Sequence, residues 1–150
     1  MTILIADDDR ALVLLLSKHL LKKGFEVTGA YDAMQASITA MRKPVDAVIL
    51  DIGMPAGTGY EVLKRMRSNL KSSLTPVIVL SGSIRPDEEE KVKTLGGDAF
   101  LRKPVDFAQL DSVLARLLDL PADSAQPGTP ASNQAPPGSG GGPNLLSVGR

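Results

Sequence analysis

Five short apolar runs alternate with five amphipathic segments along residues 1–120, and this order constrains the fold more than any other feature of the chain. Each run is short enough to be a buried strand, and each amphipathic segment long enough to be a helix. Strict alternation of strand and helix predicts a parallel sheet with right-handed crossovers and helices on both faces. We therefore expect an α/β fold. The predicted strands are residues 3–6, 25–28, 46–50, 77–80 and 99–102.

The helices are predicted from their start signals and apolar stripes. Three of them open with an acid or hydroxyl residue followed three positions later by Gln or Glu, which is capping-box spacing. The acids at 88–90 suit the positive N-terminus of the fourth helix, and we expect them to form a solvated face. The predicted inner stripes of the first three helices are Leu12, Leu15, Leu16, His19 and Leu20, then Met34, Ile38 and Met41, then Val62, Leu63, Met66 and Leu70.

The balance of charge excludes some classes of partner. There are 17 basic and 17 acidic residues and no basic run, so we expect no direct binding of nucleic acid. The chain has no cysteine, which removes disulfides, thiol nucleophiles and thiolate metal sites. No stretch resembles a signal peptide or reaches the length of a membrane span. A cytoplasmic protein without membrane contact is therefore the expectation.

The composition changes at Pro121. Among the last 30 residues, six are proline and six are glycine, and only Asp123 and Arg150 carry side-chain charge. A segment of this kind buries too little apolar surface to offset its ordering entropy. We expect one domain over residues 1–120 and a disordered Pro/Gly/Ser-rich tail over 121–150.

Polar side chains follow four of the apolar runs where each predicted strand ends. Asp7 and Asp8 follow the first, Asp51 the third, Ser81 the fourth and Lys103 the fifth. In a parallel sheet these ends gather at one edge, where ligands bind. The four segments are therefore expected to build one site around Asp51.

The chemistry of this set favours a phosphoryl group. Three crowded carboxylates repel one another, and a hard divalent cation with oxygen ligands relieves the repulsion, with Mg²⁺ the expected ion. A metal and Lys103 would neutralise a tetrahedral dianion, while Ser81 would donate a hydrogen bond. The chain lacks cysteine, and its single histidine, His19, is expected to pack within the first helix. The nucleophile is then the Asp51 carboxylate, which would form an acyl phosphate.

Residues 1 to about 120 resemble a response-regulator receiver domain of two-component signalling, of the chemotaxis-regulator type. The resemblance rests on four marks in order: Asp7-Asp8, the segment D-I-G-M-P-A-G-T-G at residues 51–59, Ser81-Gly82 and Lys103-Pro104. It implies a doubly wound, flavodoxin-like sheet in the order 2-1-3-4-5, flanked by five helices.

The resemblance also implies roles for individual residues. Mg²⁺ would be held by Asp7, Asp8, Asp51 and the main-chain carbonyl of Gly53. Asp51 would be the phosphoacceptor, Lys103 would pair with the phosphoryl group and Ser81 would move towards it. The Lys103–Pro104 bond would be cis, the one kind of peptide bond at which that isomer is inexpensive. An aromatic switch residue would stand at Phe100, where plain core packing is an equal alternative.

The implied function is that of a stand-alone response regulator. It would take the phosphoryl group from a histidine kinase or a histidine phosphotransfer protein, and act on a downstream protein through the fourth helix, fifth strand and fifth helix. It would catalyse only its own phosphorylation and dephosphorylation.

Four alternatives stand beside this interpretation. The chain could be a receiver severed from a DNA-binding or enzymatic output domain, with the tail as linker, or a pseudo-receiver that is never phosphorylated. A phosphatase of the haloacid dehalogenase type also uses an aspartyl phosphate, but it needs an acid at the position that Gly53 occupies. Residues 7–9 could also be only a helix cap, and for Asp9 a cap or surface charge is the expected role.

Overall fold

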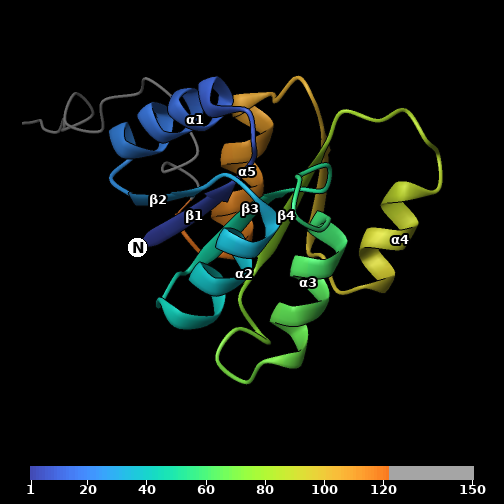
Figure 1. The fold of residues 1–150 in the computed structure, drawn as a ribbon. Coiled ribbons are helices and arrows are strands. Elements are labelled where there is room, and N and C mark those ends of the chain that lie inside the picture. Colours follow the sequence, from blue (N-terminus) through green and yellow to red (C-terminus); the bar gives the residue numbers. More distant parts are fainter. Residues whose placement is uncertain (122–150) are drawn as a thin grey trace, which may run out of the picture.

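Five parallel strands form one sheet in the computed structural model, which describes residues 1–121. The strand order is β2-β1-β3-β4-β5, which confirms the predicted doubly wound α/β fold (Figure 1). The tail predicted to be disordered, apart from its first residue, lies outside the described residues. The strands are β1 Thr2–Ala6, β2 Glu26–Ala30, β3 Ala47–Asp51, β4 Val77–Ser81 and β5 Ala99–Arg102, and the helices are α1 Arg10–Lys22, α2 Ala33–Arg42, α3 Gly59–Ser68, α4 Glu88–Thr94 and α5 Phe107–Leu117.

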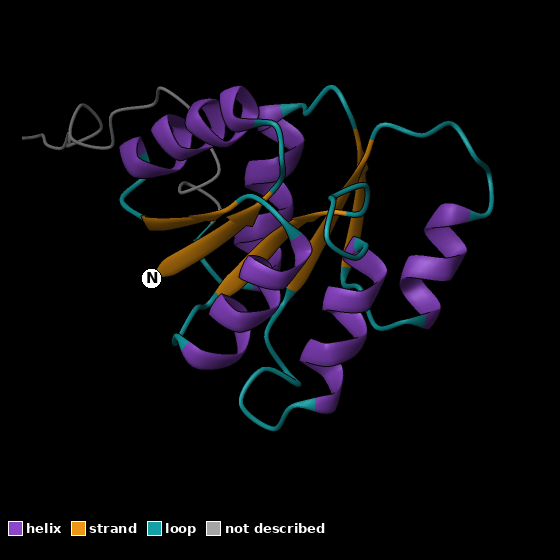
Figure 2. Ribbon diagram, viewed as in Figure 1, coloured by secondary structure: helices purple, strands orange, loops and turns teal. Residues whose placement is uncertain are grey.

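Helices cover both faces of the sheet (Figure 2). One core lies between the sheet and α2, α3 and α4, and a second lies between the sheet and α1 and α5. Successive residues of β3 alternate between these cores: Val48 and Leu50 enter the first, Ala47 and Ile49 the second. Every residue of β3 and β4 is buried, which is why these strands are continuous apolar runs in the sequence.

The predicted inner stripe of α2 is wrong for two of its three residues. Met34 is 61% exposed and Ile38 44% exposed. The buried side of this helix consists of small residues instead, and they allow its backbone to approach β1 and α3 closely. Larger side chains would not fit in that interval and lie on the outer side. The buried residues are Ala33, Ala36, Ser37 and Ala40.

Two other stripes need smaller corrections. In α1 the core residues are Val13, Leu16 and Leu20, whereas Leu15 is 54% exposed. Helix α3 ends at Ser68, so the predicted stripe residue Leu70 lies in the following loop and is 96% exposed. Apolarity at a helical spacing therefore identified the inner face of these two helices, apart from Leu15 and Leu70.

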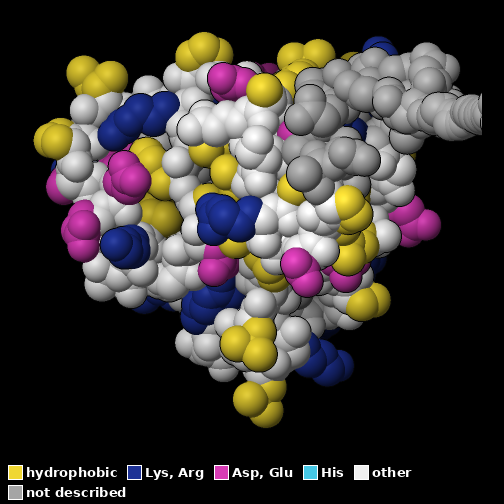
Figure 3. All heavy atoms as spheres, turned by 180° about the vertical axis from the view of Figure 1, so that it is seen from behind, with side chains coloured by type: hydrophobic (Ala, Val, Ile, Leu, Met, Phe, Trp, Pro, Cys, Tyr) yellow, Lys and Arg dark blue, Asp and Glu magenta, His cyan; other side chains and the backbone are white. Residues whose placement is uncertain are grey.

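The surface carries charge of both signs. On the face shown in Figure 3, acidic and basic side chains are interspersed, in keeping with the equal numbers of each in the sequence. Within residues 1–121, every helix is too short or too polar to cross a bilayer.

Candidate functional site

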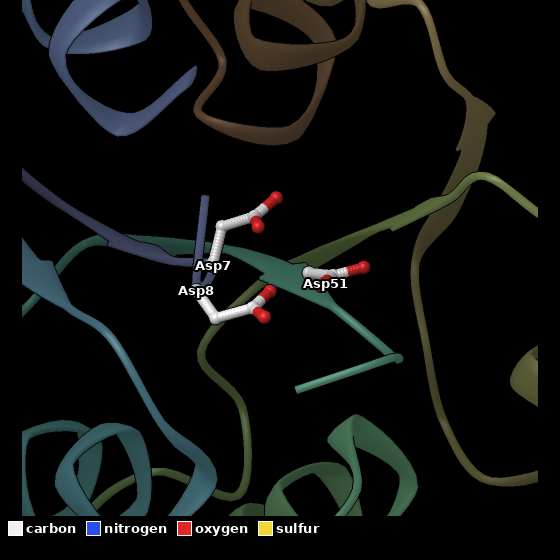
Figure 4. A group of neighbouring side chains, drawn as sticks. All are labelled: Asp7, Asp8 and Asp51. Atoms are coloured by element: carbon white, nitrogen blue, oxygen red, sulfur yellow. The ribbon is translucent and has the colours of Figure 1, made fainter. Parts of the chain in front are cut away.

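Three carboxylates meet at the carboxyl edge of the sheet. Asp7 and Asp8 directly follow β1, and Asp51 is the last residue of the adjacent strand β3 (Figure 4). One oxygen from each acid lies within 4.8 Å of the others. Asp7 and Asp51 are buried, and Asp8 is exposed. The edge thus combines two desolvated acids with one that faces water.

The pairing of β1 with β3 brings these acids together. Ala6 is aligned with Leu50, so the next residues, Asp7 and Asp51, lie side by side at the carboxyl edge of the sheet. The backbone N–H of Asp9 donates to Asp7 Oδ1 at 2.9 Å and orients that carboxylate. Asp9 itself accepts from the N–H of Leu12 as the N-cap of α1, which confirms the expected capping role.

The segment after Asp51 is packed tightly against the strand end. A Cβ at Gly59, the first residue of α3, would lie 2.5 Å from the Asp51 carbonyl oxygen and 2.5 Å from Ile52 Cα. The N–H of Gly59 donates to the Ile52 carbonyl at 3.2 Å. Only glycine allows α3 to begin this close to the acid-bearing strand.

Lys103 bridges the buried acids. Its Nζ lies 2.8 Å from Asp7 Oδ2 and 3.5 Å from Asp51 Oδ1. The N–H of Lys103 donates to the carbonyl of Ser81 at 2.8 Å, which extends the β4–β5 pairing by one residue and holds the lysine at this edge. The bond from Lys103 to Pro104 is cis.

The electrostatics of the site favour a cation. Burial raises the pKa of Asp51, and so does the charge of Asp7, while Lys103 and the N–H of Gly53 act in the opposite direction without cancelling the rise. Burial lowers the pKa of Lys103, but its contact with Asp7 and the charges of Asp51 and Asp7 outweigh this, so its pKa is raised. Lys103 is therefore protonated, and ionisation of Asp51 is less favourable than that of an exposed aspartate.

The residues present fit a divalent metal ion. Three carboxylates face one ammonium, so negative charge is in excess. Asp7 Oδ2 is buried, and the Lys103 ammonium, 2.8 Å away, is its charged partner. Gly53 lies beside the Asp51 carboxylate, and its backbone N–H lowers the pKa of that acid. Carboxylate oxygens with this excess of charge match the ligand preference of Mg²⁺.

Ser81 lies at the end of β4 and its hydroxyl faces α4. It donates to Glu88 Oε1 at 2.5 Å and accepts from the N–H of Ser83 at 3.1 Å. The prediction that residues 88–90 form a solvated face is therefore wrong for Glu88, which is half-buried. The reason is tertiary: α4 begins beside the end of β4, and nothing in the local sequence indicates that approach.

Phe100 is half-buried on β5 and packs against the core beneath α3 and α4. The Arg102 guanidinium lies over its ring, 5.1 Å from the centroid. The packing alternative thus accounts for its present position, and the switch role stays a prediction.

A largely apolar groove adjoins the acids. It has a volume of about 500 Å³ and lies between α1 and the segment that joins β5 to α5. Lys103 is common to this groove and to the acid cluster. The residues that line it are Asp9, Leu12, Leu15, Lys103, Pro104, Val105 and Phe107.

With this geometry in view, comparison with known proteins decides the family. The family model of the response regulator receiver domain matches residues 3–115. The chain belongs to this family. Receiver domains are components of two-component signalling, so the resemblance inferred from the sequence is confirmed.

Among curated relatives, the chain is 38% identical over 112 residues to the response regulator GtcR of Aneurinibacillus migulanus, a match that covers 75% of this chain and 44% of GtcR. It is 37% identical over 134 residues to the sensory/regulatory protein RpfC of Xanthomonas campestris, covering 88% of this chain and 18% of RpfC. The chain therefore spans less than half the length of these relatives.

Solved receiver structures agree with the fold. One is the receiver domain of a sensor histidine kinase from Pseudomonas aeruginosa, with a magnesium ion coordinated in its active-site cleft; it is 27% identical, has a TM-score of 0.73, and the match covers 79% of this chain and 97% of that one. A chemotaxis protein of Vibrio cholerae is 30% identical with a TM-score of 0.73, over 78% of this chain and 98% of the other.

Proposed function

We propose that this receiver domain accepts a phosphoryl group on Asp51, with Mg²⁺ bound by Asp7, Asp8, Asp51 and the carbonyl of Gly53. The convergence of the three acids within 4.8 Å, with Lys103 bridging two of them, carries the proposal. The excess of three carboxylates over the one Lys103 ammonium supports the metal. The magnesium-bound cleft of the Pseudomonas aeruginosa receiver is a parallel in the same family.

The reaction is a transfer between two nucleophiles. A carboxylate oxygen of Asp51 attacks the phosphorus of a phosphohistidine; the new O–P bond forms as the N–P bond breaks, and the imidazole leaves with the electron pair. Lys103 is protonated and close enough to neutralise a phosphoryl oxygen. Bound Mg²⁺ would supply further charge neutralisation. Hydrolysis of the acyl phosphate by water returns the free carboxylate.

The donor is proposed to be a histidine kinase or a histidine phosphotransfer protein. Its phosphohistidine must reach Asp51, and the apolar groove beside Lys103 opens at the same edge. Leu15 lines this groove and Leu14 adjoins it in sequence; both are more than half exposed on α1. An apolar helical surface of the donor would fit here, with its histidine directed to the acids.

The output is proposed to be a protein contact. The surface formed by α4, β5 and α5 is the proposed docking site for the downstream target, with Ser81 and Phe100 as the residues that respond to phosphorylation. We propose that residues 1–120 are a self-contained signalling domain located in the cytoplasm, whose only reaction is its own phosphorylation and dephosphorylation. An attached output domain is the second candidate, because the relatives GtcR and RpfC are longer than this chain.

Two remaining alternatives have less support. A pseudo-receiver would not need the metal-compatible acids, and here all three converge. A haloacid-dehalogenase phosphatase would need an acid where Gly53 stands, and family membership points elsewhere.

Labelling with a small phosphodonor tests the proposal. The protein is incubated with acetyl phosphate, with and without Mg²⁺, and its intact mass is measured. One phosphoryl group should be added only when Mg²⁺ is present, and none should be added to Asp51→Asn. Labelling of that variant to the same extent as wild type would refute the assignment of Asp51.

A further inference from the structure

The Ser81 hydroxyl can donate one hydrogen bond, and Glu88 accepts it. The Oγ–Oε1 distance of 2.5 Å is that of a charge-assisted hydrogen bond. The N–H of Ser83 occupies an acceptor position on the same oxygen. Ser81 is therefore fully engaged by the segment that leads into α4, and its proton is directed towards that helix.

Glu88 differs from the acids around it. It is half-buried, whereas Asp87, Glu89 and Glu90 are exposed. It is also the first residue of α4. Burial of a carboxylate is compensated only if a donor reaches it, and here the donor is the Ser81 hydroxyl.

Helix α4 has few other anchors. It is only seven residues long, Val92 is its one buried residue, and its N-cap, Asp87, makes no side-chain capping bond. The Ser81–Glu88 hydrogen bond therefore accounts for a large part of what fixes the first turn. Breaking it would free the start of α4 more readily than that of a longer, better packed helix.

We propose that Glu88 is a positioning residue that keeps the Ser81 hydroxyl turned away from Asp51 in the unphosphorylated protein, and that the phosphoryl group releases α4 by accepting the Ser81 hydrogen bond in place of Glu88. The inference rests on the proposed function. A phosphoryl dianion and the Glu88 carboxylate both require the same single donor, so binding of one excludes the other. Phosphorylation at Asp51 should therefore weaken the Ser81–Glu88 contact, and this contact should in turn disfavour the phosphorylated state.

Tyr60 offers a probe of the helix start. Its ring lies 4.1 Å from Lys91 Nζ of α4, and its pKa is raised by burial and then by the charges of Glu88 and Asp87. Release of Glu88 should change the tyrosine fluorescence. The chain has no tryptophan and two tyrosines, so a Tyr31→Phe background leaves Tyr60 as the only emitter.

The test measures the affinity of beryllium fluoride, a phosphoryl mimic, in the presence of Mg²⁺. Glu88→Ala should bind it about three- to thirtyfold more tightly than wild type, which corresponds to the loss of one competing hydrogen bond. Glu88→Gln keeps a neutral acceptor and should fall between the two. Glu89→Ala, the matched control, removes the same charge from the exposed position next along α4 and should bind like wild type.

A double-mutant cycle with Ser81→Ala separates this role from a general effect of charge. In the Ser81→Ala background, Glu88→Ala should no longer alter affinity, and the Tyr60 response to beryllium fluoride should be lost. An equal effect of Glu88→Ala and Glu89→Ala, or an effect of Glu88→Ala that persists without Ser81, would overturn the inference alone. If wild type neither binds the mimic nor accepts a phosphoryl group, the proposed function itself falls.

Discussion

Replacing the proposed phosphoacceptor should stabilise the protein. Asp51 is 5% exposed, and its charged form is opposed by burial and by the charge of Asp7. Asparagine has the same shape, but it carries no charge. In the absence of Mg²⁺ we therefore expect Asp51→Asn to raise the free energy of unfolding at neutral pH.

The distances give the size of the effect. Asp51 and Asp7 have oxygens within 4.8 Å of each other, so with an effective dielectric constant of about 20 their repulsion is at least about 3–4 kcal/mol. Attraction of Asp51 to Lys103 at 3.5 Å is about 5 kcal/mol. Exposed Asp8 adds a screened repulsion of about 1 kcal/mol. These terms nearly cancel, so the desolvation of the charge is uncompensated. We expect a net gain of about 1–3 kcal/mol in the variant.

Urea unfolding at several pH values is the assay. Because the pKa of Asp51 is raised in the folded state, wild type takes up a proton as pH falls through that pKa, and the penalty on its charge disappears. The advantage of Asp51→Asn should be full above the raised pKa and should vanish as pH falls below the ordinary value of 3.8. Saturating Mg²⁺ should also reduce it, since the metal favours the ionised acid. A variant no more stable than wild type at pH 7, or an advantage unchanged at low pH, would refute the reasoning.

Three further substitutions test other parts of the account. Lys103→Ala leaves the buried acids without their ammonium and should cost about 2–4 kcal/mol in urea melts without metal, with Mg²⁺ restoring more stability to the variant than to wild type. Gly59→Ala places a methyl group 2.5 Å from the backbone at the end of β3. This overlap should lower the free energy of unfolding by about 1–3 kcal/mol and slow phosphorylation. In the control Gly82→Ala, the atom nearest to the added Cβ would lie 3.9 Å away, so neither effect is expected. Arg67→Lys loses the planar guanidinium that binds several carbonyls and should lower the free energy of unfolding by about 2–3 kcal/mol. The control Arg65→Lys changes an exposed side chain and should leave stability as in wild type. Equal urea melts for the two variants would contradict this.

Much of the fold could be predicted because the strands are buried on both faces. Residues 47–50 and 77–80 are apolar without interruption, and the polar residue that ends each run marks the site. Parallel strands bring their carboxyl ends to one edge, so acids distant in sequence could be expected to meet. Asp7, Asp8 and Asp51 do meet there, with Lys103 beside them.

The wrong predictions concern positions where tertiary packing determines which side chains are buried or hydrogen-bonded. In α2 the sequence offers both large apolar residues and alanines, and the close approach to the sheet selects the alanines, which leaves Met34 and Ile38 outside. Nor did the sequence indicate the bond from Arg67 to the Gly96 carbonyl, because this carbonyl lies in a loop far along the chain from α3. The bond from Ser81 to Glu88 likewise depends on where α4 starts, and a run of four acids conceals the one that is engaged.

The most direct test of the central claim is to locate the phosphoryl group chemically. After incubation with acetyl phosphate and Mg²⁺, borohydride reduction converts an aspartyl phosphate to homoserine, and peptide mass spectrometry identifies the modified position. We predict homoserine at residue 51 alone, dependent on Mg²⁺ and absent when the metal is chelated. Modification at Asp7 or Asp8 instead, or none in protein shown to be folded, would contradict the account.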